Sequence, residues 1–327
     1  MEAKLTTGES ARRLYRSRYG GLWIDRADAE EILARKLRDG EVEPADAAPL
    51  LHYIRHGYVV FSGAVSHALA DEYLACFEDA WKQPPAGIYA HSGGEVVALS
   101  DKYYDRVAKV SDLHYYFRRA NEIIFAPAVE RFLRQIYERP PVAFQSMSMR
   151  LGSEESLHID TGPLTLTEPM ALAAAWIALE DVREGSGEFQ FVPGSHRLPE
   201  VLNNGISKGH NGDMSAYYKV LQDSLRECDA RGLGTEYFMA KKGDVLIWHA
   251  DLLHGGAKIG NPGLTRKSLV CHYMPLGAMP TFYDFSGVNC LEYPGGGWYL
   301  DRIKPAAYWE PQPPSGIRRI LGLLAGR

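Results

Sequence analysis

The sequence predicts a mainly β domain, a jelly roll of two packed sheets, with α-helices flanking it. Short apolar runs separated by turns rich in Gly and Pro fill the middle and later parts of the chain, as in antiparallel β domains. Segments with helical spacing of apolar residues precede and interrupt these runs. The chain has 327 residues, 46% hydrophobic and 24% charged, so one large domain can bury a sizeable core.

Helices are predicted first, in the N-terminal part of the chain. Asp28–Leu37 begins with acidic residues, ends with basic residues and is followed by Gly40, which are the usual signals of a helix start and stop. Further helices are predicted at Glu43–His56 and Val65–Trp81 from the spacing of their apolar residues. Later helices are predicted at Tyr115–Ile124, Ala128–Tyr137 and Ala216–Cys228.

Strands are predicted where the spacing of apolar residues changes after Pro140 and Pro141. Ala143–Leu151 alternates apolar and polar residues, which indicates a half-buried strand. Ala171–Leu179 is almost entirely apolar, as a strand covered on both faces would be, although a helix of this composition is also possible. The remaining predicted strands are Tyr58–Phe61, Phe189–Val192, Val245–Trp248 and Ser268–Tyr273.

Two imidazoles and one carboxylate form a candidate metal site. His158 and Asp160 lie two residues apart, and side chains at this spacing project from the same face of a strand. A third ligand is available further along, at His254, after an apolar run. This ligand set is the facial triad associated with non-haem Fe(II) oxygenases, which keep metal positions open.

The third ligand has two candidates, because His249 and His254 lie in the same short segment. The two glycines that follow His254, and its distance from Arg266, favour His254. Arg266 opens a strand-like run, where its guanidinium group can hold a carboxylate with two hydrogen bonds. We expect His249 and His272 to be ordinary core or surface histidines.

These residues support a family resemblance. The region from Tyr58 to Pro275 resembles the phytanoyl-CoA dioxygenase family, a branch of the Fe(II)/2-oxoglutarate-dependent dioxygenases. The matching motifs, in order, are His158-Ile-Asp160, Phe191-Val-Pro-Gly-Ser-His196, Lys242-Gly-Asp244, His254-Gly-Gly256 and Asn261-Pro with Arg266-Lys267 and Cys271-His272-Tyr273.

The resemblance implies a fold and a set of site residues. The fold is the double-stranded β-helix, a cupin-like jelly roll. Iron is expected to be bound by His158, Asp160 and His254, and 2-oxoglutarate to be anchored by Arg266. The family pattern also places a tryptophan on the strand after the His-x-Asp motif, where Trp176 stands, so Trp176 is either a core residue or a wall beside the co-substrate. Lys109, in the segment Lys-Val-Ser-Asp, either reaches the co-substrate or is a solvated surface lysine.

The resemblance also implies a reaction with the cofactors Fe(II), 2-oxoglutarate and O₂. We expect hydroxylation of a small metabolite, lipid-linked or biosynthetic substrate, with release of succinate and CO₂. Asp160 argues against halogenation, because the related halogenases have a small residue in place of the carboxylate. The alternatives are a cupin-like metal hydrolase or isomerase that uses Zn or Mn, and a non-catalytic module that binds 2-oxoglutarate or a metal.

Composition limits the partners and the compartment. The net charge of −5 provides no general attraction for nucleic acid. The N-terminus lacks the apolar segment of a signal peptide, and no apolar run approaches the roughly 20 residues of a membrane span. The four cysteines include no Cys-x-x-Cys pair, which is typical of reduced thiols. We therefore expect a cytoplasmic protein with a small-molecule substrate, no nucleic-acid partner and no transmembrane segment.

The domain organisation follows from the same patterns. We expect residues 1–57 to form a helical extension packed on one catalytic domain, residues 58–327. The polar stretch 199–235 is long for a connection between strands, and such insertions often form lids. Residues 316–327 are basic and apolar, so they form either a terminal helix or a peripheral contact with an anionic membrane. The sequence leaves the oligomeric state open.

Overall fold

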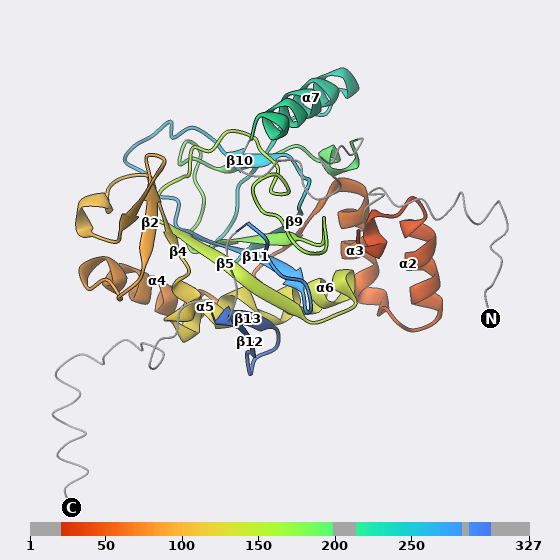
Figure 1. Ribbon diagram of the computed structural model, residues 1–327, viewed down its shortest axis with the longest axis horizontal. Coiled ribbons are helices and arrows are strands. Elements are labelled where there is room, and N and C mark those ends of the chain that lie inside the picture. Colours follow the sequence, from red (N-terminus) through yellow and green to blue (C-terminus); the bar gives the residue numbers. More distant parts are fainter. Residues whose placement is uncertain (1–20, 199–213, 283–287, 302–327) are drawn as a thin grey trace, which may run out of the picture.

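The computed structural model describes residues 21–198, 214–282 and 288–301. Antiparallel sheets form the centre of the molecule, and helices pack around them (Figure 1). The predicted architecture, a mainly β jelly roll with flanking helices, is therefore confirmed. The six α-helices of the described part are α2 (Ala29–Arg38), α3 (Pro44–His56), α4 (His67–Lys82), α5 (Arg118–Ile124), α6 (Pro127–Tyr137) and α7 (Ser215–Arg231).

The larger sheet has ten strands, eight of which follow the order β1-β9-β6-β11-β5-β4-β2-β3. Strand β11 pairs with β5 on one side and β6 on the other, so segments far apart in sequence become neighbours. The strands are β1 (Tyr58–Phe61), β2 (Tyr89–Ser92), β3 (Glu95–Ala98), β4 (Ala108–Ser111), β5 (Pro141–Met149), β6 (Ala173–Ala178), β9 (Val245–His249), β11 (Ser268–Pro275), β12 (Asn289–Glu292) and β13 (Trp298–Asp301).

The smaller sheet lies over one face of the larger one. It has three strands in the order β10-β7-β8, and these are β7 (Phe189–Phe191), β8 (Glu236–Phe238) and β10 (His254–Gly256). Helices α4, α5 and α6 lie against the other face of the larger sheet, α2 and α3 pack at one end, and α7 lies beyond the smaller sheet (Figure 1). The space between the two sheets is the part of the fold that holds the candidate site.

Alternate side chains of β11 belong to two different apolar clusters, one on each face of the larger sheet. Leu269, Cys271 and Tyr273 belong to the core shared with the helices. Val270 belongs instead to a second apolar cluster between the sheets, together with Trp176 and residues of β7 and β9. Successive side chains of a strand point to opposite faces, so β11 builds the helix-side core with one set of residues and lines the inter-sheet space with the other.

Several predicted elements differ from the observed ones. Ala171–Leu179 is not one of these, since it contains the predicted strand, β6 (Ala173–Ala178), buried along its whole length, and only the alternative helix is wrong. The segment from 89 to 111, for which the sequence indicated no strands, contains β2, β3 and β4. Each of these has only four residues, and β3 is largely exposed, so apolar alternation gives little signal. The short strands β8, β10, β12 and β13 were missed for the same reason.

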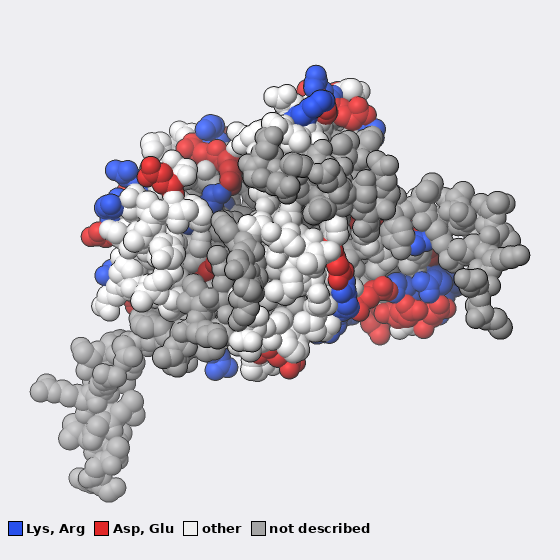
Figure 2. All heavy atoms as spheres, viewed as in Figure 1, with Lys and Arg blue, Asp and Glu red and all other residues white. Residues whose placement is uncertain are grey.

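Two segments with predicted roles fall partly or wholly outside the described residues. These are 199–213, the first part of the predicted lid, and 316–327, the predicted membrane-contact segment, so both hypotheses stay predictions. Within the described part, no helix combines the length and apolar character needed to span a membrane. Acidic and basic side chains are mixed over α2 and α7 on the face in Figure 2, with no extended basic area among its described residues.

Candidate metal centre

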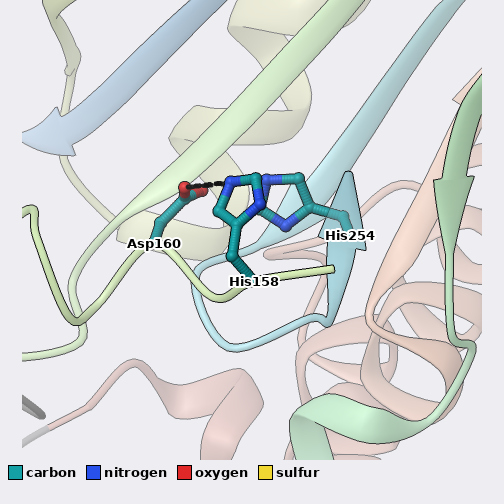
Figure 3. A group of neighbouring side chains, drawn as sticks. All are labelled: His158, Asp160 and His254. Carbon is teal, nitrogen blue, oxygen red and sulfur yellow. Dashed lines mark ion pairs between the residues drawn. The ribbon is translucent and has the colours of Figure 1, made fainter. Parts of the chain in front are cut away.

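The three expected metal ligands lie together between the sheets (Figure 3). One donor atom from each of His158, Asp160 and His254 lies within 4.8 Å of the others. The Asp160 Oδ1 atom is 3.6 Å from His254 Nε2 and 4.0 Å from His158 Nε2. The fold therefore gathers two imidazoles and one carboxylate at a single point, a donor set that suits Fe(II).

The prediction that His158 and Asp160 lie on a regular strand was wrong. His158 forms an isolated β-bridge with His254, and Asp160 begins a turn. The bridge has two backbone hydrogen bonds, from His158 N to His254 O (2.8 Å) and from His254 N to His158 O (3.0 Å). This pairing brings the two imidazoles together, with ring centroids 4.3 Å apart. The two histidines are thus brought together by a local backbone bridge, whereas the sequence had suggested that His158 and Asp160 share one face of a strand.

Backbone carbonyl groups fix the orientation of both imidazoles. His158 Nδ1 is 2.9 Å from Ser156 O, and His254 Nδ1 is 2.9 Å from Leu252 O. A carbonyl oxygen can only accept a hydrogen bond, so each Nδ1 carries a proton and is the donor. Each Nε2 is left unprotonated and faces the cluster, which is the tautomer that a metal ligand needs.

The carboxylate of Asp160 lies next to two further side chains. Trp248 Nε1 donates a hydrogen bond of 2.9 Å to Oδ2, and His272 Nε2 lies 3.8 Å from the same oxygen. Oδ1 is the oxygen nearest to the ligand histidines. Trp248 therefore holds one oxygen of Asp160 and leaves the other directed at the metal position.

Burial and neighbouring charges keep these groups in their metal-binding protonation states. Burial lowers the pKa of His254 to about 4, so this imidazole is neutral near pH 7. Burial acts to raise the pKa of Asp160, but His254, His272 and His158 together have the larger effect and hold that pKa well below its usual value. A neutral imidazole and an ionised carboxylate are the forms that bind a divalent metal.

Arg266 is a buried cation without a carboxylate ion pair among the described residues. Its side chain is almost fully buried, and burial lowers its pKa to about 10, so it stays protonated near pH 7. Its NH1 group donates to Ser268 Oγ at 3.1 Å, whereas Nε has no described hydrogen-bond partner. A buried unpaired charge is unfavourable, so this position fits an anionic ligand such as a carboxylate.

Trp176 lies beside Arg266, on the strand where the family pattern places a tryptophan. The guanidinium carbon of Arg266 is 5.3 Å from the Trp176 ring centre, a cation–π contact. The indole Nε1 is buried and also lacks a described hydrogen-bond partner. Two unsatisfied donors, Arg266 Nε and Trp176 Nε1, therefore occur in one part of the site, and a carboxylate ligand could satisfy both.

Strand register places Lys109 at the same end of the site as Arg266. Lys109 in β4 is opposite Met149 in β5, and Met149 is opposite Ser268 in β11. The amino group of Lys109 forms an ion pair with Glu155, so it is not simply a solvated surface lysine. The structure places Lys109 beside the expected co-substrate position, and its proposed role there stays a prediction.

One cavity of about 200 Å³ connects these groups. Its lining combines apolar side chains, such as Met147, Phe189 and Val270, with a similar number of polar ones. The lining residues that the sequence had indicated are Lys109, His158, Asp160, Trp176, His254 and Arg266. The cavity thus brings together all six predicted site residues.

The rival ligand His249 lies outside this cluster. It is buried and hydrogen-bonded to Asp25 over 2.7 Å, as a satisfied core histidine would be. His272, by contrast, has a position that the sequence did not indicate. It lines the cavity and lies next to Asp160.

Tyr217 of α7 is a further residue that sequence patterns did not single out. Its hydroxyl oxygen accepts from Ile159 N at 3.4 Å and lies 3.1 Å from Ile159 O, to which it donates. Ile159 stands between two candidate ligands, so α7 supports their backbone directly. A side chain on Gly162 would collide with the Tyr217 ring, at 2.0 Å from its nearest atom. Neither contact could be inferred from spacing, because α7 is remote in sequence.

The two glycines after His254 have a steric reason. A Cβ atom on Gly255 would lie 2.4 Å from the carbonyl oxygen of Glu155, and one on Gly256 would lie 2.4 Å from Ser153 Oγ. The loop that leads to His158 therefore packs directly against the backbone of β10. Glycine at both positions allows the two ligand segments to approach each other.

Solved structures with a similar fold include an α-ketoglutarate-dependent epimerase and a protein bound to 2-oxoglutarate. The chain is similar to the non-haem α-ketoglutarate-dependent epimerase SnoN from nogalamycin biosynthesis, with TM-score 0.55 and 18% identity over 79% of this chain and 99% of that one. It is also similar to EctD from S. alaskensis with 2-oxoglutarate and 5-hydroxyectoine, with TM-score 0.52 and 17% identity over 85% and 86% of the two chains. At these identities the likeness shows the fold.

Curated relatives and a family profile identify the family. Phytanoyl-CoA dioxygenase domain-containing protein 1 of Danio rerio is 25% identical over 50% of this chain, and the homologue of Caenorhabditis elegans is 21% identical over 49%. The matched parts span only 55% and 56% of those relatives. The profile of the family described as phytanoyl-CoA dioxygenase (PhyH) matches residues 53–268, which include all six predicted site residues. The chain therefore belongs to the phytanoyl-CoA dioxygenase family.

Proposed function

We propose that this protein is an Fe(II)- and 2-oxoglutarate-dependent oxygenase. The observation that carries the proposal is the pairing of two features in one cavity of about 200 Å³. One is the convergent set of His158, Asp160 and His254, and the other is the buried, unpaired guanidinium of Arg266. A metal hydrolase or isomerase with the same ligands has no need of a buried cation at this position. Family membership supports the same cofactors, Fe(II), 2-oxoglutarate and O₂.

Each residue has a defined part in this proposal. His158, Asp160 and His254 hold the metal, and Trp248 keeps one oxygen of Asp160 turned toward it. Arg266 binds a carboxylate of 2-oxoglutarate and neutralises its charge at an almost fully buried position. When bound, iron, 2-oxoglutarate and O₂ supply the oxidising chemistry.

We further propose that the oxidation is a hydroxylation of a small biosynthetic substrate, with release of succinate and CO₂. Asp160 supports this outcome over halogenation, because it fills the coordination position that a halide would need. The related folds include an epimerase and a carbocyclase, so the measured product must decide between hydroxylation and another oxidation.

The four cysteines form no disulfide, which supports a reducing compartment such as the cytoplasm.

The test is an anaerobic titration with Fe(II) followed by 2-oxoglutarate. A visible charge-transfer band is expected from the chelate in the wild-type protein. The band should be lost in His158→Ala, and it should require much higher 2-oxoglutarate concentrations in Arg266→Ala. Metal binding without a band would reject the co-substrate assignment. Turnover that persists without O₂ would then favour the hydrolase or isomerase.

A further inference from the structure

The segment before the family-matched region reaches the candidate metal centre through one carboxylate. Asp25 belongs to the 3-10 helix η1 (Trp23–Asp25), and its side chain is 4% exposed. Its Oδ1 atom is 2.7 Å from Nε2 of the buried His249, and its Oδ2 accepts from Leu22 N at 3.1 Å. A carboxylate from outside residues 53–268 is thus inserted beside β9.

The tautomer of His249 follows from its second contact. Asp251 N donates a hydrogen bond of 3.0 Å to His249 Nδ1, so Nδ1 is the acceptor and Nε2 carries the proton. His249 Nε2 therefore donates to Asp25. The imidazole connects the N-terminal extension to the turn of residues 249–252, which is closed by a hydrogen bond of 2.9 Å from Leu252 N to His249 O.

This turn makes three contacts that hold the ligand segments. Ala250 O accepts from Asp160 N at 3.0 Å, which fixes the backbone of the ligand carboxylate. Leu252 O accepts from His254 Nδ1 at 2.9 Å, which fixes a ligand imidazole. Asp251 Oδ1 accepts from Thr161 Oγ1 at 2.6 Å, directly after Asp160. Displacement of the turn would therefore move two of the three candidate ligands.

We propose that Asp25 is a positioning residue of the metal centre. It acts through His249 and the 249–252 turn. The N-terminal extension therefore helps to position the metal ligands, in addition to packing against the core. The proposal rests on the metal-binding role of His158, Asp160 and His254. Residues that hydrogen-bond the ligands directly typically change metal affinity or activity 10- to 100-fold when they are removed, and Asp25 acts behind such contacts.

The rival explanation is that Asp25 only anchors the extension. Other contacts already serve that purpose: Trp23 Nε1 donates to Gln135 O at 3.0 Å, and Lys36 of α2 forms an ion pair with Glu138. Both lead to α6 or its end and do not involve the turn. Glu138→Gln is therefore a matched control, because it weakens the anchoring of the extension and leaves Asp25 and His249 in place.

The experiment titrates the full chain anaerobically with Co(II) alone and follows its visible ligand-field bands. Asp25→Ala should raise the Co(II) dissociation constant about tenfold, at the lower end of that range, because Asp25 is one residue further from the metal. The band shape should also change, since the donor atoms are less well fixed. Glu138→Gln should show the wild-type affinity and bands. Equal affinity in the wild type and a folded Asp25→Ala would overturn the proposal.

A second variant covers the case in which Asp25→Ala does not fold. Asp25→Leu combined with His249→Phe replaces both members of the buried pair with apolar groups of similar shape. No side chain of the pair is left unsatisfied, although the N–H groups of Leu22 and Asp251 lose their acceptors. The same loss of Co(II) affinity is expected, and unchanged affinity rejects the proposal. If the wild type binds Co(II) but gives no band with Fe(II) and 2-oxoglutarate, the proposed function fails while the role of Asp25 is still measured.

Discussion

Removal of one N–H group should test how the carboxylate ligand is oriented. Trp248→Phe keeps an aromatic ring in the inter-sheet core and deletes the donor that lies 2.9 Å from Asp160 Oδ2. Both side chains are buried, so water does not readily replace the lost hydrogen bond. The remaining neighbour of Oδ2, His272 Nε2, is 3.8 Å away, too far for a normal hydrogen bond. The carboxylate is then free to rotate away from the metal position.

The expected magnitude follows from the charge on the acceptor. A hydrogen bond to a charged group contributes about 1.5–3 kcal/mol. Because about 1.4 kcal/mol corresponds to a factor of ten, the loss of Fe(II) affinity should be about tenfold, with about a hundredfold as the upper limit. The upper limit applies if, in the variant, the whole free energy of orienting the Asp160 carboxylate must be supplied by metal binding. This range agrees with the effect of other residues that orient metal ligands.

The assay is anaerobic Fe(II) titration of Trp248→Phe, followed by titration with 2-oxoglutarate. Trp176→Phe is the matched control, because Trp176 Nε1 lies in the same cavity but bonds to no described atom. It should leave Fe(II) affinity unchanged and weaken only the binding of 2-oxoglutarate. Wild-type Fe(II) affinity in Trp248→Phe, or an equal loss in Trp176→Phe, would refute the reasoning.

Two further changes test other parts of the site, and a third tests a buried histidine outside it. Arg266→Lys keeps the charge but loses the two-pronged geometry, so KM for 2-oxoglutarate should rise at least about tenfold in a succinate assay; an unchanged KM would contradict its role. Tyr217→Phe removes the bonds to Ile159 and should weaken Co(II) binding several-fold, whereas the exposed Tyr218→Phe should have no effect. His114 is fully buried, and burial lowers its pKa from 6.5 to about 3. Below pH 6.5 this imidazole is protonated in the unfolded chain but stays neutral in the folded protein. The free energy of unfolding should therefore fall by up to about 1.4 kcal/mol per pH unit as the pH drops from 6.5 toward 4. Urea denaturation at several pH values should show a flatter profile for His114→Gln.

The sequence was sufficient to select, from motifs, residues that the fold brings together around one cavity. His158, Asp160 and His254 were selected by residue type and order, and the two glycines after His254 helped to reject His249. Arg266 was found because it follows the third ligand at the start of a strand. In each case the chemistry depends on the residue itself, so a linear pattern carries the information.

The supporting contacts could not be predicted because they depend on packing between distant segments. Asp25 and His249 are separated by 224 positions, and no spacing rule joins them. Tyr217 appears in the sequence as an ordinary aromatic residue of an amphipathic helix. The two bonds that it makes to Ile159 exist only because α7 folds back over the ligand loop.

The position of the ligand pair was predicted for the wrong structural reason. The alternation of side chains on a strand would place His158 and Asp160 on the same face. Here the ligands are brought together instead by the backbone bridge between His158 and His254. Only three residues, His254–Gly256, form β10, which is too short for a period of two to be recognised. Strand signals therefore succeed for long buried strands such as β11 and fail where a single bridge positions a ligand.

The burial of Arg266 has a consequence for the abundance of the protein. An unpaired buried cation lowers the stability of the empty fold, and an anion that binds there returns that stability. A ligand that binds only the folded state adds about 2.7 kcal/mol of stability at a concentration one hundred times its dissociation constant. A cell rich in 2-oxoglutarate would then contain fewer unfolded copies for proteases to remove. If the proposed co-substrate binds at Arg266, it would stabilise the folded protein to an extent that grows with the logarithm of its concentration.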